Sequence, residues 1–251
     1  MAKTKSAEST PIGGAVISQQ IALQLLEEMR TGPYQQSERL PAEVELAARL
    51  GVSRTVIRDA LAELEREGYV ERVRGIGTVI NRRTVQLPNR LDQKFEYSTM
   101  IRAAGHEPQA DHITLQQIFA DSHLADRLGI PCGDPVLVVR KRILADHIPV
   151  IYSVDYLPRN LFEGHNLEFL DFSRPIFDLL QELCSITITS TITHVNAVLG
   201  DANIRETLKV PSHEALLLMD EQSFSRLAKP VMYSLSYYTN FFHFAILRKK
   251  M

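Results

Sequence analysis

The spacing of hydrophobic residues predicts a helix near the start of the chain. Apolar side chains recur at every fourth position from Ile17 to Met29, which places them on one face of a helix. The residues at 31–33 (Thr-Gly-Pro) would end this helix. Residues 1–14 are mostly small and polar, with two glycines at the end, and we expect a flexible tail there.

Two further helices follow, and a short turn separates them. Pro41 suits the first turn of a second helix that ends at Gly51, because the N–H that proline lacks is not needed there. Ser53 is a favourable N-cap for a third helix, which buries apolar residues at helical spacing and stops at Gly68. A connection this short between two helices is typical of a helix-turn-helix.

The alternation of polar and apolar residues after the third helix predicts a β-hairpin. Residues 69–73 alternate like a strand, residues 74–77 contain two glycines and form the turn, and residues 78–80 return. Three helices and a hairpin make a winged helix, whose third helix enters the major groove of DNA, where the base edges differ most. The alternative is a helical interaction module whose arginines are only solvated.

Polar residues at the start of the third helix and on the hairpin are the candidate DNA contacts. Those on the helix lie away from its apolar face, and those on the hairpin flank a glycine turn that lets the backbone approach phosphate closely. The candidates are Arg54, Thr55, Arg58, Arg72, Arg74 and Gly75.

The rest of the chain contains a repeat at an offset of 80 to 81 residues. Residues 128–131 correspond to 208–211, residues 136–139 to 216–219, and residues 149–156 to 230–237. Each copy reads as strand, helix, strand, strand. Two such copies sharing one antiparallel sheet predict an α+β domain.

The two copies differ at a cluster of charges. Arg140, Lys141 and Arg142 in the first copy are replaced by Asp220, Glu221 and Gln222 in the second. On a strand, Arg140 and Arg142 share one face and Lys141 lies on the other. Two arginines on one face could hold a phosphate or carboxylate. The alternative is two surface arginines paired with carboxylates such as Asp220.

The composition excludes several classes of protein. The 251 residues are 45% hydrophobic and 23% charged, which fits a soluble globular protein of one large domain or two smaller ones. No apolar run approaches the roughly 18 residues that span a membrane, and the start lacks the apolar core of a signal peptide. Cys132 and Cys184 are too few for a disulfide framework, so we expect the cytoplasm.

The distribution of charge matters more than its sum. The net charge is −2, yet five arginines and no acidic residue lie between Arg72 and Arg90. Because phosphate contact depends on local charge, the near-neutral total does not exclude DNA binding. The eight histidines are scattered without metal-ligand spacing, and we expect no metal, no cofactor and no catalytic residue.

Residues 39–58 closely resemble the GntR family of bacterial transcription regulators, and residues 64–70 and 75–78 continue the resemblance through the hairpin. Many members of the family carry a polar residue where this chain has Val44, and Arg39 would take over that contact. The resemblance implies a DNA-binding domain in which the operator meets Ser53, Arg54, Thr55 and Arg58, with Arg74 and Gly75 at the wing.

The region from Tyr97 to Arg248 resembles the UTRA domain, the effector-binding module of the HutC branch of this family, which shares its fold with chorismate lyase. Residues 128–131, 133–136, 140–142 and 237–238 carry the resemblance. It implies a small-molecule pocket in which Arg140 and Arg142 hold an anionic group, helped by Ser98 and lined by Tyr238.

The expected effector pocket departs from that of sugar-phosphate-sensing relatives. They often have carboxylates where this chain has Ser153 and Met232, and neither side chain replaces a charged acceptor. We therefore expect a small anionic metabolite, phosphorylated or carboxylated, with few hydroxyl groups.

Together these features predict a bacterial transcription regulator, and we expect a repressor that binds a palindromic operator in double-stranded DNA as a homodimer. The expected organisation is a tail over 1–14, a winged helix over 15–81, a linker over 82–94, and an effector-binding and dimerisation domain over 95–251. Two alternatives stay open: an enzyme of chorismate-lyase-like fold, and a DNA-binding protein that responds to no ligand.

Overall fold

The computed structural model describes residues 12–249, which fall into two compact units. Among these residues, the first unit comprises 12–90 together with 245–249, and the second comprises Leu91–Phe244. Residues 245–249 therefore belong to the same unit as the N-terminal helices. Within residues 12–249, no helix combines the length and the apolar character needed to cross a membrane.

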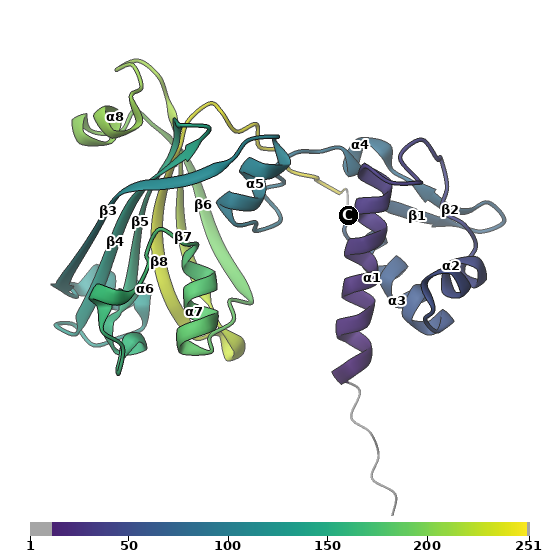
Figure 1. Cartoon of the computed structure of the whole chain (residues 1–251), viewed down its shortest axis with the longest axis horizontal. Coiled ribbons are helices and arrows are strands. Elements are labelled where there is room, and N and C mark those ends of the chain that lie inside the picture. Colours follow the sequence, from purple (N-terminus) through teal and green to yellow (C-terminus); the bar gives the residue numbers. More distant parts are fainter. Residues whose placement is uncertain (1–11, 250–251) are drawn as a thin grey trace, which may run out of the picture. The chain divides into compact units, whose positions relative to one another are not determined.

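The first unit is a winged helix, as the sequence predicts. Figure 1 shows its elements, which include a two-stranded antiparallel hairpin after the third helix. Its helices are α1 (Ile12–Arg30), α2 (Glu43–Leu50), α3 (Arg54–Arg66) and a short α4 (Arg82–Val85), and its strands are β1 (Val70–Val73) and β2 (Gly77–Ile80). Because α1 begins at Ile12, residues 12–14 of the expected tail are helical, while residues 1–11 lie outside the described residues.

Local residues fix the turn between α2 and α3, and one core holds the helices together. Gly51 ends α2 with a left-handed backbone (φ +65°), a conformation that costs glycine little. The Ser53 hydroxyl oxygen accepts a hydrogen bond of 3.3 Å from the backbone N–H of Val56 and caps α3. The fully buried centre of this unit is formed by Leu25, Met29, Leu46, Ile57 and Leu61.

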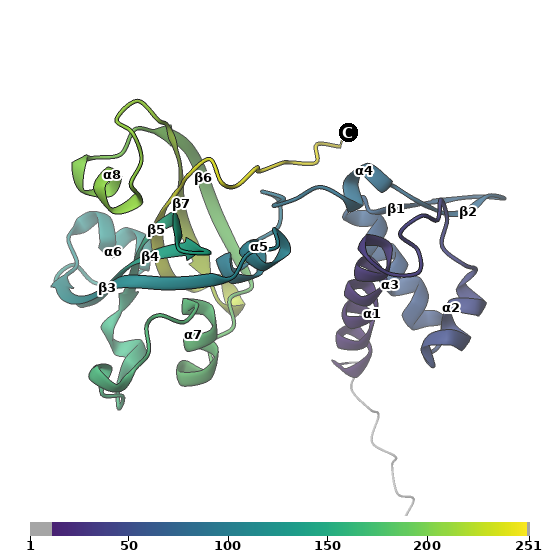
Figure 2. The same cartoon turned by 45° about the horizontal axis from the view of Figure 1, so that its top comes forward.

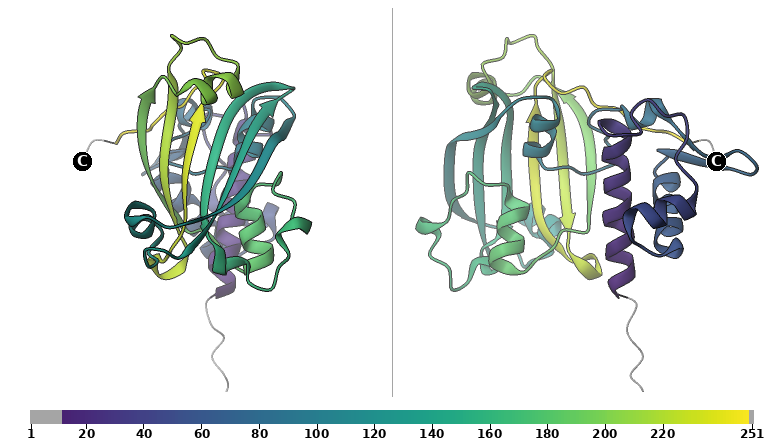
Figure 3. Two further views of the ribbon diagram at one scale, coloured as in Figure 1. Left: turned by 90° about the vertical axis from the view of Figure 1, so that its left-hand side faces the viewer. Right: turned by 45° about the vertical axis from the view of Figure 1, so that its right-hand side comes forward.

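The second unit is built on a six-stranded antiparallel sheet whose order reflects the sequence repeat. The order is β3-β4-β5-β8-β7-β6, so the two copies meet at β5 and β8, with Val154 opposite Leu235. The left panel of Figure 3 shows the three teal strands of the first copy beside the three green-to-yellow strands of the second. The strands are β3 (Pro108–Phe119), β4 (Pro135–Ala145), β5 (Ile148–Pro158), β6 (Ser190–Val198), β7 (Leu216–Phe224) and β8 (Pro230–Tyr238).

Helices cover both faces of this sheet. On one face, α6 (Ser122–Leu128) and α8 (Ala202–Leu208) occupy equivalent places in the two copies and pack on residues such as Val136 and Val138. On the other face, α7 (Ile176–Cys184) packs on Leu137 and Val139 (Figure 2). The remaining elements are α5 (Tyr97–Ala103) and the 3₁₀ turns Arg159–Phe162, Leu167–Phe169 and Arg226–Ala228.

Candidate functional sites

The start of α3 presents a row of exposed polar residues. Ser53, Arg54, Thr55 and Arg58 are exposed, whereas the opposite side of the helix is buried in the core. Arg54 lies 4.0 Å from Glu43, and because this distance is long and the Arg54 side chain is exposed, the ion pair is weak. Arg58 forms no hydrogen bond or ion pair with any residue that the structure describes. Its guanidinium is therefore available to a partner.

The tip of the hairpin is open to solvent. Arg74, Gly75 and Ile76 are exposed, and Gly75 has a left-handed backbone (φ +78°) with open space where a side chain would begin. The Nη1 atom of Arg39 donates a hydrogen bond of 3.2 Å to the carbonyl oxygen of Ile76. Arg39 therefore lies against the turn that carries Arg74, where an anionic backbone could approach both.

Arg72 is held by the far end of α3. Its Nη2 lies 2.6 Å from Oε2 of Glu65, and its backbone N–H donates a hydrogen bond of 2.8 Å to Oε1 of the same carboxylate. These hydrogen bonds hold the pKa of Glu65 below its ordinary value. The pair ties the hairpin to α3, so Arg72 has a structural partner in addition to its expected role at DNA.

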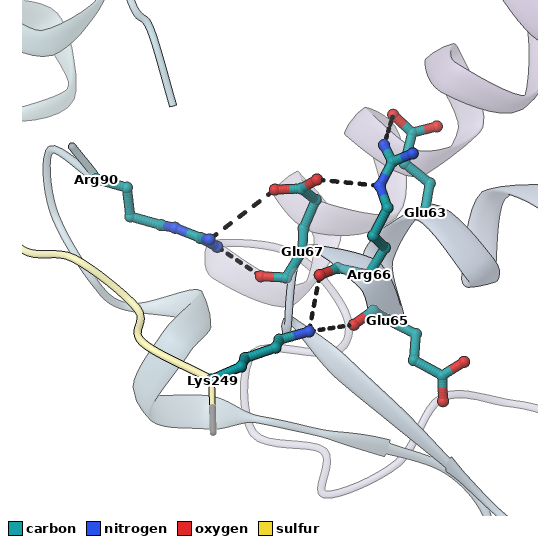
Figure 4. A network of polar contacts seen from close by, with 6 residues as sticks. All are labelled: Glu63, Glu65, Arg66, Glu67, Arg90 and Lys249. Atoms are coloured by element: carbon teal, nitrogen blue, oxygen red, sulfur yellow. Dashed lines mark hydrogen bonds and ion pairs between the residues drawn. The ribbon is translucent and has the colours of Figure 1, made fainter. Parts of the chain in front are cut away.

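The end of the chain binds the C-terminal end of α3 (Figure 4). The Lys249 ammonium donates hydrogen bonds to the carbonyl oxygens of Glu65 (2.9 Å) and Arg66 (2.7 Å). The buried Arg90 donates to the carbonyl oxygen of Glu67 at 2.8 Å. The last carbonyls of a helix have no partner within it and carry partial negative charge, so both cations are favourable there.

A cavity of about 50 Å³ opens in the second unit, on the face of the sheet that α7 covers. It lies between β4, β5, β7 and β8, the segment 94–97 and the start of α7. By volume it has room for roughly three to five water molecules. Its buried polar lining consists of Lys141, Ser153, Asp155, Glu221, Ser234 and Ser236.

Lys141 supplies the buried positive charge of this cavity. Its ammonium donates a hydrogen bond of 2.8 Å to the carbonyl oxygen of Arg174 and lies 5.4 Å from the centre of the Tyr97 ring. Burial lowers the pKa of Lys141, because a charged ammonium loses its hydration, although the nearby carboxyl groups of Asp155 and Glu96 act in the opposite direction.

Three carboxyl groups face the same cavity. Glu221 accepts hydrogen bonds from Nζ of Lys94 (2.5 Å) and from Oγ1 of Thr193 (2.8 Å). Asp155 accepts one from the Ser153 hydroxyl at 3.1 Å, and its burial raises the pKa of Asp155. Burial also raises the pKa of Glu96 to about 7. Near neutral pH, Glu96 therefore holds its proton for much of the time.

The chain matches two family models. The model described as UTRA domain matches residues 103–240, and the model described as bacterial regulatory proteins, gntR family, matches residues 17–80. This chain belongs to the GntR family of transcription regulators with a UTRA domain. Both models cover the elements described above, namely the winged helix and the duplicated sheet.

Relatives of known name are transcription regulators and not enzymes. The chain is 29% identical to the probable transcriptional regulator PhnF of Escherichia coli strain K12, over 79% of this chain and 80% of that one. It is also 29% identical to the HTH-type transcriptional repressor NagR of Bacillus subtilis strain 168, over 68% of each chain. The relatives thus agree with the two domains in placing this chain among DNA-binding regulators.

Solved structures share the fold. The possible transcriptional regulator YydK from Bacillus subtilis has a TM-score of 0.74 at 19% identity, covering 93% of this chain and 99% of that one. PhnF from Mycobacterium smegmatis has a TM-score of 0.60 at 24% identity, covering 94% and 100%. At these identities the likeness concerns the fold alone.

Of the residues that the sequence suggested for effector binding in the UTRA domain, some line the cavity and others do not. Ser153 and Tyr238 line the cavity, whereas Ser98 is half-buried and does not. Arg140 and Arg142 lie on the opposite face of the sheet, because side chains alternate along β4 and Lys141 is the one that faces the cavity. The expected two-arginine grip is therefore not formed in this cavity.

Both arginines have partners on their own face. The Nε and Nη2 atoms of Arg142 donate to the two carboxylate oxygens of Asp111 at 2.8 and 2.7 Å, and Nη1 donates to the carbonyl oxygen of Thr207 at 3.1 Å. Arg140 donates to Oε1 of Gln116 at 3.1 Å. Pairing with a carboxylate, the alternative considered for these arginines, is found at Arg142, but with Asp111 in place of Asp220.

The sequence interpretation missed the acidic side of the UTRA cavity. Asp155 and Glu221 are nearly fully buried, and neither was singled out as a ligand for an effector. One signal was available for Asp155, which is the single charged residue in a strand of mostly apolar residues. A charged residue in a buried strand is rare unless it is paired or functional.

Proposed function

We propose that this GntR-family regulator is a repressor whose operator binding is controlled by a small anionic metabolite bound in the cavity of its UTRA domain. The observation that carries the proposal is Lys141, a buried ammonium on the cavity wall. Among the described residues, no carboxylate oxygen lies within 4.0 Å of its nitrogen. A buried cation without a counter-ion favours an anionic ligand.

Hydroxyl groups complete the proposed anion site. Ser234, Ser236 and Tyr238 of β8 line the cavity and are buried, and their hydroxyls form no hydrogen bond with any residue that the structure describes. These hydroxyls are open to the cavity and keep their donors free, so a phosphate or carboxylate bound there could accept hydrogen bonds from them. In this proposal Lys141 takes the role that was expected of Arg140 and Arg142.

On the DNA side, the exposed start of α3 would read the major groove. Ser53, Arg54, Thr55 and Arg58 are the proposed contacts there, and Arg39, Arg72, Arg74 and Gly75 are the proposed contacts of the wing. We infer a homodimer on a palindromic operator, since two copies related by a two-fold axis present two recognition helices to two half-sites. Two cysteines without a disulfide agree with a cytoplasmic protein.

A repressor role is supported by the name of one relative. NagR of Bacillus subtilis is called a repressor, and it is 29% identical to this chain over 172 residues. In a repressor of this kind, the metabolite would lower operator affinity by binding more tightly to the form that does not bind DNA.

The connections between the two units would carry this coupling. The chain passes between the units twice, at residues 90–91 and 244–245. On one side of each connection lies a contact with the end of α3, from Arg90 or Lys249. On the other side lies a segment that lines the cavity, either 94–97 or the end of β8 at Tyr238.

Mass spectrometry of small molecules that co-purify with the protein, followed by operator titration, tests the proposal. Fluorescence anisotropy with DNA from upstream of the protein's own gene would give the operator Kd with and without the identified metabolite. We expect the metabolite to raise this Kd at least fivefold. An operator Kd that no co-purified or added anion changes would contradict the proposal, and a lowered Kd would contradict the repressor role.

A further inference from the structure

Two opposite charges line the UTRA cavity without pairing with each other. Lys141 is 2% exposed and Asp155 is 5% exposed, and both side chains face the cavity. Among the residues that the structure describes, Asp155 has no cationic nitrogen within 4.0 Å, just as Lys141 has no carboxylate. Each is the main opposing charge near the other, yet no direct ion pair joins them, so burial disfavours both charged forms.

Both charged groups have bonding capacity left for a ligand. An ammonium has three N–H donors, and that of Lys141 uses one on the Arg174 carbonyl at 2.8 Å and another, at 3.5 Å, on that of Phe172. A carboxylate has two oxygens, and Oδ1 of Asp155 accepts a single hydrogen bond from Ser153. The remaining N–H and the remaining oxygen could bind opposite ends of one molecule.

The sheet fixes how far apart these two groups lie. Lys141 on β4 is directly opposite Ser153 on β5, and Asp155 is two residues further along β5 on the same face. The two residues are therefore diagonal neighbours, whose backbones lie roughly 7–8 Å apart in an antiparallel pair. Both side chains line the same cavity, so one small molecule could contact both charged groups.

The other charges of the cavity are accounted for within the protein. The Glu221 carboxylate is paired with the Lys94 ammonium at 2.5 Å and is also bonded to Thr193. Glu96 is the group whose pKa lies near 7 because it is buried. Lys141 and Asp155 are thus one basic and one acidic group that no other charged group of the described residues contacts directly. A ligand with only an anionic group would favour the charged form of Lys141 and leave the Asp155 carboxyl without a direct partner.

We propose that the effector is a small dipolar ion, with its anionic group bound by Lys141 and its ammonium group bound by Asp155. The hydroxyls of Ser234 and Ser236 would donate to the anion. This inference rests on the proposed function, because it names the chemical class of the metabolite that the cavity would bind. It narrows the class from any small molecule with an anionic group to one that also carries an ammonium group.

Matched pairs of compounds that differ only by the ammonium group test this proposal. Suitable pairs are O-phosphoethanolamine with ethyl phosphate, β-alanine with propionate, and taurine with ethanesulfonate. Isothermal titration of the full chain with all six compounds would give the binding constants. We expect at least one ammonium-bearing compound to bind at least tenfold more tightly than its partner. If no pair shows this preference, including the case in which none of the six binds, the proposal is overturned.

Two neighbouring carboxylates provide the variant and its control. Asp155→Asn removes the charge that faces the cavity, and we expect the tenfold preference within the pair to fall to about twofold or less. Asp220→Asn changes a carboxylate next to Glu221 that pairs with Arg127 and does not line the cavity, and we expect it to keep the preference. A preference that survives Asp155→Asn would overturn the assignment. The comparison in the unmodified protein stands even if Asp155→Asn does not fold.

Operator titration separates this proposal from the proposed function. If an ammonium-bearing compound binds with the expected preference and the operator Kd does not change, the dipolar site stands and the control of DNA binding fails. Suppose instead that an anion without an amine binds the cavity more tightly than its ammonium-bearing counterpart and changes the operator Kd. Then the control of DNA binding stands and the dipolar site fails.

Discussion

Replacing Glu96 by glutamine should change how the stability of the second unit depends on pH. Burial raises the pKa of Glu96 from 4.5 to about 7, so the folded protein holds this proton more tightly than the unfolded chain. The contribution of Glu96 to stability is therefore complete below about pH 4.5 and is lost as the pH rises through 7. Glutamine is close in size and does not titrate.

The size of the change in stability follows from the interval between the two pKa values of Glu96, 4.5 in the unfolded chain and about 7 in the folded protein. It spans roughly 2.5 pH units, and each corresponds to about 1.4 kcal/mol, so ionised Glu96 costs at most about 3.5 kcal/mol above pH 7. We expect Glu96→Gln to be more stable than the unmodified protein by about 2–3 kcal/mol at pH 8, and to differ by less than about 1 kcal/mol at pH 5. For a unit of this size, the gain at pH 8 corresponds to roughly 4–12 °C in Tm.

Differential scanning calorimetry of both proteins at pH 5 and pH 8 measures this difference. Glu163→Gln is a suitable control, because Glu163 is an exposed glutamate of the same unit outside the cavity. We expect it to leave the pH dependence unchanged. If Glu96→Gln has the same effect on Tm at both pH values, or lowers Tm at pH 8, Glu96 ionises as it would in water and the reasoning from its burial is refuted.

Three further predictions concern single residues. Arg58→Ala should weaken operator binding about tenfold or more in anisotropy titrations, because loss of one guanidinium contact costs about 1–3 kcal/mol. Arg66→Ala, at the other exposed end of α3, should leave the affinity unchanged, and equal affinities of the two variants would remove Arg58 from the interface. Gly68→Ala should lower the free energy of unfolding by about 1–3 kcal/mol in urea titrations. The reason is that Gly68 has φ +79° and that the new Cβ would lie 2.4 Å from Cδ2 of Leu247, so unchanged stability would contradict this packing. Asp111→Asn should cost about 1 kcal/mol through its pair with Arg142 and leave ligand titrations unchanged; a loss of ligand binding would return Arg142 to the effector site.

Much of the fold follows from local sequence signals. Gly51 and Ser53 set the turn of the helix-turn-helix through their own backbone and side-chain preferences, so the sequence predicts them without knowledge of the rest of the chain. The repeat predicts the sheet for a similar reason, since two copies of one strand–helix–strand–strand pattern have a simple way to share an antiparallel sheet. The structure confirms this at the junction of β5 and β8.

The location of the cavity could not be read from the sequence in this way. In a strand that is buried on one face, apolar and polar residues alternate, and the alternation reveals the inner face. In β4, however, Val136–Val139 are all buried, because helices cover both sides of the strand. The sequence therefore showed that Arg140 and Lys141 point in opposite directions without showing which direction leads to the cavity. The contact of Lys249 with the end of α3 joins residues 184 positions apart and leaves no local signal.

The central claim is that a ligand beside Lys141 controls DNA binding. The most direct measurement is the ratio of operator Kd values with and without the co-purified metabolite, compared between Lys141→Met and Arg140→Gln. These neighbours on β4 face opposite sides of the sheet. We predict a ratio near one for Lys141→Met and a ratio of at least five for Arg140→Gln. A ratio that survives in Lys141→Met, or that is lost only in Arg140→Gln, would contradict the account.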